Sequence, residues 1–230
     1  MFYFDNLNGY KILKSDFLDK ISGVDAFFTT RCEENPIKSD FASRVITPDQ
    51  THSDHIEIVD ERNEYPETDG LITTEPDTAI YLRFADCTPI IFYDKEHNIG
   101  AISHAGWKGT ASRIAVKTVA KMVLNFSTKP ENLIVLIGPA ISACCYEVGE
   151  DVKNKLLSTV NNHDKLFNGN KADLKKINAR QLETIGVNTI DICPYCTCCN
   201  NDLFYSYRKE NGTTKRHFAV FKLFDNKNNT

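Results

Sequence analysis

Cys87 and His104 have side chains suited to metal binding or nucleophilic chemistry. A thiolate and an imidazole are common zinc ligands, and they also form nucleophile and base pairs. Cys87 and His104 each stand at the end of a run rich in β-branched and aromatic residues. These runs predict buried strands at Ala79–Phe84, Ile90–Tyr93 and Ile99–Ser103. Groups at the ends of rigid strands are held in the fixed geometry that such chemistry needs.

His52 is a candidate for the further ligand that such a site would need. It lies just before a strand predicted at Ile56–Val59. Taken alone, a histidine in this position is more often a turn residue, and the neighbouring His55 cannot be dismissed on spacing. The residues by themselves therefore leave both interpretations open.

Basic residues near predicted turns are candidates for binding an anionic substrate. The segment Gly106–Gly109 contains Lys108 and predicts a tight turn whose N–H groups could cradle an anion, although a packing turn is the more common use of such a segment. Arg31 follows a strand predicted at Val24–Thr30. Arg208 lies in an aromatic run and needs an anionic partner there, for which an internal carboxylate is favoured over a substrate phosphate.

Eight cysteines occur in the chain, and their spacing leaves their roles open. Four of them lie within seven residues, too close together for a zinc ribbon, and no βαβ pattern supports a thioredoxin-like motif. These four are Cys193, Cys196, Cys198 and Cys199. Cys144 and Cys145 are neighbours on a predicted strand, so at most one of them is expected to face any given site. A non-enzymatic role of the cysteine-rich segment in partner binding or redox sensing is a further hypothesis.

Length and composition predict one soluble domain, residues 1–230, in the cytoplasm. No linker, repeat or low-complexity tract interrupts the 230 residues, and the net charge of −4 argues against a nucleic-acid-binding protein. The sequence contains neither a signal peptide pattern nor the roughly 18 consecutive apolar residues of a membrane span. In a reducing compartment the cysteines are expected to be thiols, metal ligands or nucleophiles and not disulfides.

The remaining pattern predicts further strands and two helices. One helix is expected from about Thr110, with a buried face formed by Ala115, Val119, Met122, Val123 and Phe126. A second helix is expected after an N-cap at Asp173. Strands are predicted at Leu133–Ile137, Thr189–Ile192, Phe204–Arg208 and His217–Leu223. Residues 33–49 are expected to form a loop, and residues 225–230 a solvated tail.

Six motifs occur in one order between about Gln50 and Arg208: TDGLIT, ADCTPI, SHAGWKGT, IGPAIS followed by ACCYEVG, the CT at Cys196, and YSYR. Together they resemble the laccase-domain family. Its members are described as multicopper polyphenol oxidoreductases and also as purine nucleoside phosphorylases with adenosine deaminase activity. The family's metal-binding trio lies in QxH, ADC and HAGW contexts, so the resemblance implies that His52, Cys87 and His104 are metal ligands and catalytic residues.

The resemblance also implies the fold, which is α+β and similar to a toxin deamidase domain. Mixed β-sheets are expected to pack face to face with helices outside, in α-β-β-α layers. The chain departs from the family pattern at two places. The segment from Cys32 to Gln50 is short and lacks a Gly-Gly-Val-Ser turn, and Thr214-Lys215-Arg216 stands where the family has Thr-Gly-Arg.

The activity that the resemblance implies is phosphorolysis of adenosine, inosine or methylthioadenosine to the base and ribose 1-phosphate, with adenosine deamination in the same site. A zinc ion with three protein ligands would lower the pKa of bound water to about 7. Deamination needs a general acid and base as well, for which Asp69 and Glu147 are the candidates. Arg31, Lys108 and Arg208 are the candidates for binding the phosphate.

Two other enzymatic interpretations stay open. A Cys-His hydrolase or amidase would use Cys87 as nucleophile and His104 as base, without a metal. A copper-dependent polyphenol oxidase would need many histidine ligands and typically an axial methionine. The chain has six histidines and two methionines, so zinc is favoured over copper.

Overall fold

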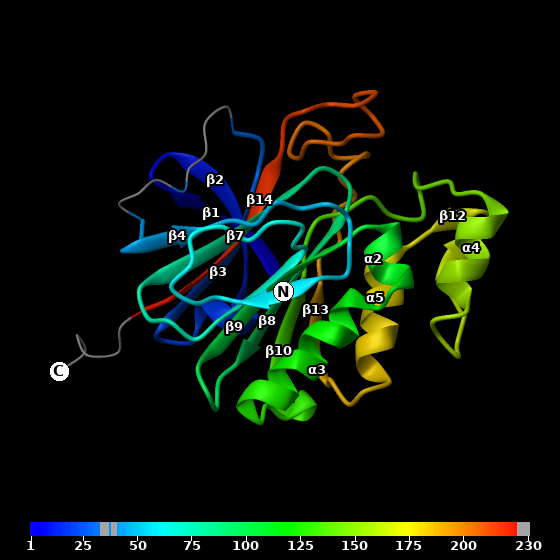
Figure 1. The fold of residues 1–230 in the computed structure, drawn as a ribbon. Coiled ribbons are helices and arrows are strands. Elements are labelled where there is room, and N and C mark those ends of the chain that lie inside the picture. Colours follow the sequence, from blue (N-terminus) through cyan, green and yellow to red (C-terminus); the bar gives the residue numbers. More distant parts are fainter. Residues whose placement is uncertain (33–36, 38–40, 225–230) are drawn as a thin grey trace.

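The computed structural model describes residues 1–32, 37 and 41–224, in which two six-stranded mixed sheets dominate (Figure 1). The strands of the first sheet, in spatial order, are Phe2–Leu7 (β1), Tyr10–Ser15 (β2), Val24–Thr29 (β3), His217–Leu223 (β14), Thr78–Phe84 (β7) and Arg44–Ile46 (β4). Those of the second are Thr189–Ile192 (β13), Leu133–Ile137 (β10), Thr88–Asp94 (β8), Ile99–Ala105 (β9), Gly70–Thr73 (β6) and Ile56–Ile58 (β5). A short hairpin pairs Phe167–Asn168 (β11) with Lys171–Ala172 (β12).

The two sheets pack face to face, as the sequence predicted. Their shared core contains Phe28 and Phe221 from the first sheet and Ile91 and Ile102 from the second. The sheets approach so closely that a Cβ atom on Gly100 of β9 would lie 1.7 Å from the Phe221 ring, so only glycine fits there. All seven residues of β8 and all seven of β9 are buried, which explains their continuous apolar sequences.

The described helices are Asp16–Asp19 (α1), Trp107–Ala111 (α2), Ile114–Phe126 (α3), Glu150–Leu157 (α4) and Leu174–Glu183 (α5), with a 3₁₀ turn at Pro130–Asn132. Helices α3 and α5 cover the outer face of the second sheet (Figure 1), whereas α1 packs against β2 and β3 of the first. Side chains of α3 and α5 share a core with β8, β9 and β10. As predicted, Asp173 caps α5, since its side chain accepts a hydrogen bond from the Lys176 N–H.

The helix predicted from Thr110 is divided into two. Arg113 adopts a left-handed conformation with φ of 59° and separates α2 from α3. The buried face of α3 consists of Ile114, Ala115, Thr118, Val119 and Met122. Val123, predicted to be buried, is 38% exposed.

Three other local predictions are wrong where the structure describes the residues. Phe204–Arg208 is a turn segment, held by the Glu210 carboxylate, which accepts hydrogen bonds from the Ser206 N–H and the Asn201 amide. Cys144 and Cys145 lie in a turn and not on a strand. The predicted loop at 33–49 contains β4, while its residues 33–36 and 38–40 and the tail 225–230 lie outside the described residues.

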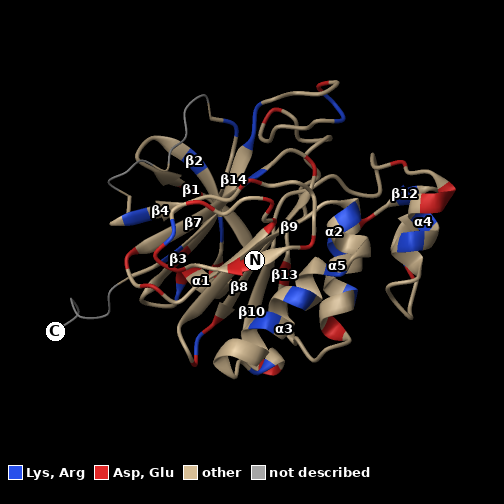
Figure 2. Cartoon of the chain, viewed as in Figure 1, with Lys and Arg blue, Asp and Glu red and all other residues tan. Residues whose placement is uncertain are grey.

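Charged residues of both signs occur on strands, helices and loops of the described chain (Figure 2). None of the helices within the described ranges has the length and apolar character needed to cross a membrane.

Candidate active site

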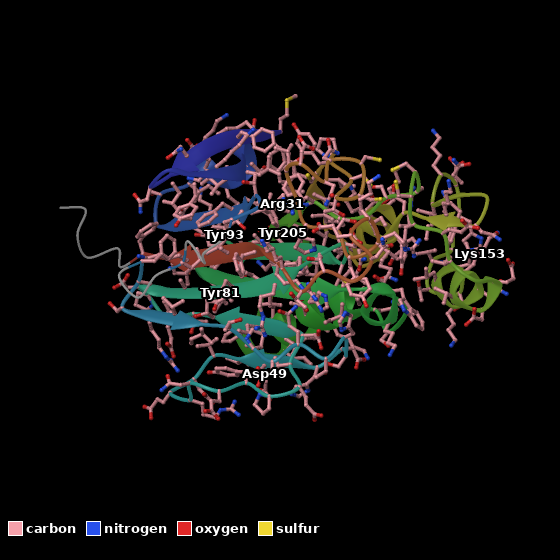
Figure 3. All side chains as sticks on the ribbon, turned by 90° about the horizontal axis from the view of Figure 1, so that it is seen from above. Arg31, Asp49, Tyr81, Tyr93, Lys153 and Tyr205 are labelled. Atoms are coloured by element: carbon pink, nitrogen blue, oxygen red, sulfur yellow. The ribbon has the colours of Figure 1, made fainter. Side chains whose placement is uncertain are left out.

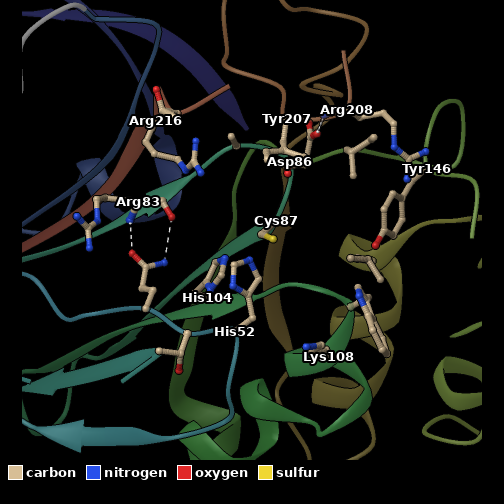
Figure 4. A pocket seen from close by; sticks show the side chains of 17 residues that line it. His52, Arg83, Asp86, Cys87, His104, Lys108, Tyr146, Tyr207, Arg208 and Arg216 are labelled. Atoms are coloured by element: carbon tan, nitrogen blue, oxygen red, sulfur yellow. Dashed lines mark hydrogen bonds between the residues drawn. The ribbon is translucent and has the colours of Figure 1, made fainter. Parts of the chain in front are cut away.

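The three predicted site residues come together where the chain passes from one sheet to the other. β7 belongs to the first sheet and β8 to the second, and Cys87 lies in the crossing between them. His104, near the end of β9, is paired with Pro89 of β8. His52 comes from the segment between β4 and β5, and the three ligand atoms all lie within 4.8 Å of one another (Figure 4).

Asp69 positions two of these side chains through its carboxylate. Its Oδ1 accepts hydrogen bonds from the His52 N–H at 3.1 Å and pairs with the His104 Nδ1 at 2.7 Å. Its Oδ2 accepts from the Thr51 N–H at 3.1 Å, the Ser53 N–H at 2.7 Å and the Ser53 hydroxyl at 2.8 Å. The pairing of β6 with β9 places Asp69 beside His104, whose N–H donates to the Asp69 carbonyl.

The backbone is in the left-handed region at two residues of the site. His52 has φ of 61° and Asp86, next to Cys87, has φ of 85°. A residue other than glycine in this region costs about 1–3 kcal/mol, so neighbouring interactions must maintain it. For His52 they come from the Asp69 carboxylate. For Asp86 they come from the Thr197 hydroxyl at 2.6 Å and the Arg208 N–H at 2.7 Å, which donate to its carboxylate.

The buried groups of the site carry opposite charges. Burial alone would raise the pKa of the Cys87 thiol, but the neighbouring His104 and His52 lower it to about 6. Burial would lower the pKa of His104, but the Cys87 thiolate and the Asp69 carboxylate raise it to about 9. Burial also opposes ionisation of Asp69, yet its hydrogen bonds to His104 and Ser53 lower its pKa to about 2. Without a metal, the site therefore holds a thiolate, an imidazolium and a carboxylate at neutral pH.

The trio fits a metal ion. Because the His104 Nδ1 bonds to Asp69, its Nε2 is the atom left to face Cys87 and His52, which is the usual arrangement of a metal-binding histidine. Gly106 has no side chain and so leaves space for an ion beside the trio. A Cβ atom at this position would lie 3.0 Å from the Cys87 Sγ and 3.4 Å from the His52 ring. Two imidazoles and a thiolate form a donor set typical of zinc, and their role as ligands stays a prediction.

A pocket of about 810 Å³ opens above the trio (Figure 4). Its walls carry aromatic side chains from Trp107, Tyr146 and Tyr207. Four cations also line it: Arg83, Lys108, Arg208 and Arg216. Throughout residues 1–32, 37 and 41–224, no carboxylate forms an ion pair with any of these four side chains. The pocket therefore offers four cationic side chains that form no ion pair with a carboxylate of the described residues.

The pocket includes only some of the residues predicted to bind substrate. Lys108 and Arg208 line it, whereas Arg31 and Glu147 do not. Arg31 pairs with Glu210 at 3.0 Å and lies over the ring of Tyr205 (Figure 3). Asp69 lies behind His104, fully buried, and its hydrogen bonds leave it no role at the pocket surface.

The internal carboxylate expected for Arg208 is absent from the described structure. Its guanidinium donates to the carbonyls of Cys145 at 3.4 Å and Glu147 at 3.2 Å and packs against the Tyr146 ring. Because the side chain is exposed, the predicted cost of an unpaired buried charge does not arise.

Sequence reasoning missed the pocket residues Arg83, Asp86, Tyr146, Tyr207 and Arg216. Arg83 is an exposed residue of β7, so its apolar neighbours gave no sign of a functional role. Arg216 lies in the segment that stands in place of the family's Thr-Gly-Arg. This partial match to a family motif was the sequence feature that could have pointed to Arg216 as a pocket residue.

Comparison with known proteins agrees with the motif assignment. Residues 19–223 match the model of the family described as multi-copper polyphenol oxidoreductase laccase. A purine nucleoside phosphorylase of Clostridium acetobutylicum is 37% identical over 172 residues, 74% of this chain and 73% of that protein. The purine nucleoside phosphorylase YlmD of Bacillus subtilis is 32% identical over 192 residues, 76% of this chain and 69% of that protein.

Solved structures share the whole architecture. YlmD from Geobacillus stearothermophilus superposes with a TM-score of 0.85 and 27% identity, covering 98% of this chain and 100% of that one. The hypothetical protein YfiH of Bacillus licheniformis gives a TM-score of 0.83 and 29% identity, covering 96% and 98%. The predicted fold class is thereby confirmed.

Proposed function

Because the chain belongs to the multi-copper polyphenol oxidoreductase laccase family, we propose that it is a zinc-dependent purine nucleoside phosphorylase. The names of its relatives in Clostridium acetobutylicum and Bacillus subtilis support this activity. His52, Cys87 and His104 are the proposed metal ligands. When bound, zinc would act as a Lewis acid that stabilises developing negative charge.

Zinc is proposed and not copper because of the histidines. A multicopper site requires several histidines around more than one ion. Four of the six histidines lie elsewhere: His55 pairs with Glu57, His97 with Asp94, His163 with backbone carbonyls, and His217 is buried in the core. Only two therefore remain for the site.

One observation carries the proposal of phosphorolysis: four cations without ion-pair partners among the described residues surround the trio in one pocket. Guanidinium and ammonium groups bind phosphate oxygens through charge-assisted hydrogen bonds. Arg83 and Arg216 lie on one side of the trio, and Lys108 and Arg208 on the other (Figure 4). The four cations would hold a phosphate in a fixed orientation for reaction and would offset its negative charge.

The reaction forms one bond and breaks one. A phosphate oxygen attacks C1′ of the ribose as the bond from C1′ to the purine nitrogen breaks. The electron pair of that bond leaves with the purine, which takes up a proton, and ribose 1-phosphate is released. Electrostatic stabilisation of this charge separation is the contribution that a preorganised cationic pocket can make.

The aromatic wall of the pocket suits the purine. Trp107 and Tyr207 offer ring faces for stacking, and Tyr146 offers a ring and a hydroxyl. Burial, together with the nearby Cys87, raises the pKa of Tyr146 to about 12, so its hydroxyl stays protonated and can donate a hydrogen bond to the departing base. Tyr146 is the residue that we propose to stabilise charge on the purine.

Adenosine deamination in the same pocket is part of the proposal, because a His-Cys zinc site is a common feature of nucleoside deaminases. Of the two predicted acid and base candidates, Asp69 is committed to His52 and His104, and Glu147 lies outside the pocket. Asp86 is the carboxylate that lines the pocket, and each of its oxygens accepts only one of the bonds described above, so acceptor positions remain. We propose Asp86 in place of Asp69 and Glu147.

The test is chromatography of the purified protein incubated with inosine or adenosine, with and without phosphate. Phosphate-dependent release of hypoxanthine or adenine is expected, and phosphate-independent inosine from adenosine would report deamination. His52→Ala, Cys87→Ala and His104→Ala should each abolish turnover while circular dichroism stays unchanged. His55→Ala, an exposed histidine three residues from His52, is the matched control and should keep full activity. Full activity in any trio variant would contradict the proposal.

A second candidate, a Cys-His hydrolase, is favoured by one specific observation. Cys87, His104 and Asp69 are aligned as a nucleophile, a base and an orienting carboxylate, and the pKa values of the first two support an ion pair. This activity would persist after complete removal of metal by a chelator, and alkylation of the Cys87 thiolate would abolish it. Phosphorolysis lost on chelation and restored by zinc would exclude it as the main function.

A further inference from the structure

A second cluster of metal-binding side chains lies outside the active site. The Sγ atoms of Cys144, Cys145, Cys196 and Cys199 all lie within 4.8 Å of one another. We propose that these four cysteines bind one zinc ion, which ties the segment around Cys144 to the segment around Cys196 beside the active-site pocket. This site is independent of the His52, Cys87 and His104 trio.

The spacing of the sulfurs fits a single tetrahedral ion. Zinc–sulfur bonds of about 2.3 Å place two sulfurs of a tetrahedron about 3.8 Å apart. The Cys199 Sγ lies 3.4 Å from the Cys144 Sγ and 3.4 Å from the Cys145 Sγ. A disulfide would need about 2.05 Å, and a cluster of several iron atoms would hold the four sulfurs farther apart.

The turn that carries two of the sulfurs is held by backbone hydrogen bonds. The Asn200 N–H donates to the Cys196 carbonyl at 2.9 Å, and the Thr197 N–H donates to the Ala140 carbonyl at 3.2 Å. The second bond ties this turn to the chain segment that leads to Cys144. Cys196 and Cys199 are spaced as a Cys-x-x-Cys pair, and the adjacent Cys144 and Cys145, which lie 55 and 54 residues before Cys199, complete the set.

Three cations that form no ion pair with a described carboxylate contact backbone carbonyls near the cluster, as expected beside an ion with four thiolates and a net charge of −2. Lys175 is only 4% exposed and donates to the carbonyls of Cys193 at 2.7 Å and Tyr195 at 2.9 Å. Within the described part of the chain it has no ion pair with a carboxylate. Lys171 and Arg208 donate to the carbonyls of Cys144 and Cys145. A buried ammonium requires compensation, which a dianionic zinc tetrathiolate would provide.

The four-cysteine cluster lies next to segments that form one wall of the active-site pocket. Cys145 directly precedes Tyr146, and the segment after Cys199 leads to Tyr207 and Arg208, all three of which line the pocket. Within the described residues, a backbone bridge between Ala140 and Cys196 and the contacts of Arg208 also join these segments. A bound zinc would therefore fix one wall of the pocket.

The test is elemental analysis of the purified holoprotein by mass spectrometry, for zinc, copper and iron per chain. The Cys144→Ser/Cys199→Ser variant, which alters two exposed side chains, should contain one equivalent of zinc less than the wild type. Cys87→Ala should retain the zinc of the four-cysteine site even if it loses the ion of the trio. The two sites are thus distinguished, and failure of the proposed function would leave this result unchanged.

The matched control is Cys198→Ser, because Cys198 lies in the same segment and is not one of the four. It should keep the zinc content of the wild type. The proposal is wrong if the double variant keeps the full metal content, if Cys198→Ser loses as much, or if thiol titration of unfolded wild type finds a disulfide among these cysteines.

A spectroscopic measurement keeps the test valid if the double variant fails to fold. Cobalt is titrated into metal-depleted Cys87→Ala protein, in which the trio site is disabled. Thiolate-to-cobalt charge-transfer absorption with the intensity of four thiolates is expected, and it should disappear on addition of zinc. Absence of this absorption in the folded protein would refute the site.

Discussion

Replacing Asp69 with asparagine should remove metal from the active site while leaving every ligand in place. In the favoured orientation, the asparagine carbonyl takes the place of Oδ2 and keeps the three donors of Thr51 and Ser53. The new NH₂ group then faces the His52 N–H and the His104 Nδ1. The His104 Nδ1 would then accept a hydrogen bond from the amide, so the neutral ring would carry its hydrogen on Nε2, which could not bind a metal.

The expected magnitude follows from the lost hydrogen bonds. The His52 N–H is left facing another donor, which costs about 1–3 kcal/mol, and the hydrogen bonds to Oδ2 lose their charge assistance. A total near 3 kcal/mol corresponds to a fall in Tm of about 6–12 °C for a chain of this length. Loss of an orienting partner lowers metal affinity by about 10–100-fold, and the wrong histidine tautomer places Asp69→Asn at the upper end of that range.

The assay is competition for zinc against a chromophoric chelator, paired with thermal unfolding. The matched control is Asp94→Asn, at the far end of β8, where a buried aspartate accepts from the Glu96 and His97 N–H groups and pairs with the His97 Nδ1 at 2.8 Å. It should lower Tm similarly and leave the affinity of the trio unchanged. Wild-type affinity in Asp69→Asn, or equal loss of affinity in Asp94→Asn, would refute the reasoning.

Three further predictions follow from the site and the core. Arg83→Ala should raise the KM for phosphate by about 10-fold or more, because a charge-assisted contact is lost. Arg31→Ala should leave this KM unchanged, because the Arg31 guanidinium pairs with Glu210 outside the pocket. Equal effects of the two variants in steady-state kinetics would contradict the pocket assignment. Gly106→Ala should weaken zinc binding with little change in circular dichroism, because its Cβ would lie 3.0 Å from the Cys87 Sγ; unchanged zinc affinity would show that the space is not needed. Burial lowers the pKa of His217 from 6.5 to about 3, so only the unfolded chain binds a proton at this residue as the pH falls below about 6.5. Between pH 6.5 and 5 the wild type should therefore lose about 2 kcal/mol of unfolding free energy that His217→Phe retains. Parallel curves of unfolding free energy against pH for the two proteins would exclude this.

Many of the elements could be predicted because their signals are local. Continuous apolar runs predicted β8, β9 and β10, since strands buried on both faces have no polar face. The hairpin of β1 and β2 was not predicted, although Asn8-Gly9, both with positive φ, is the sequence signal of its turn. Phe204–Arg208 has strand-like composition, but hydrogen bonds to Glu210 from residues nearby in the chain hold it in turns.

Local sequence patterns placed Cys87 and His104 at the ends of strands, and the family motifs added His52 as a predicted ligand. Which residues lie beside this trio depends on contacts between distant segments, which local patterns do not report. Asp69 supports two of these residues because β6 pairs with β9, and Arg31 is excluded from the pocket because Glu210 lies next to it. Cys144 and Cys145 meet Cys196 and Cys199, although 55 and 54 residues separate them from Cys199, because both segments follow neighbouring parallel strands, β10 and β13, that end at the same edge of the sheet. Spacing along a chain reports contacts within one element, and contacts between elements depend on how the sheets pair and pack.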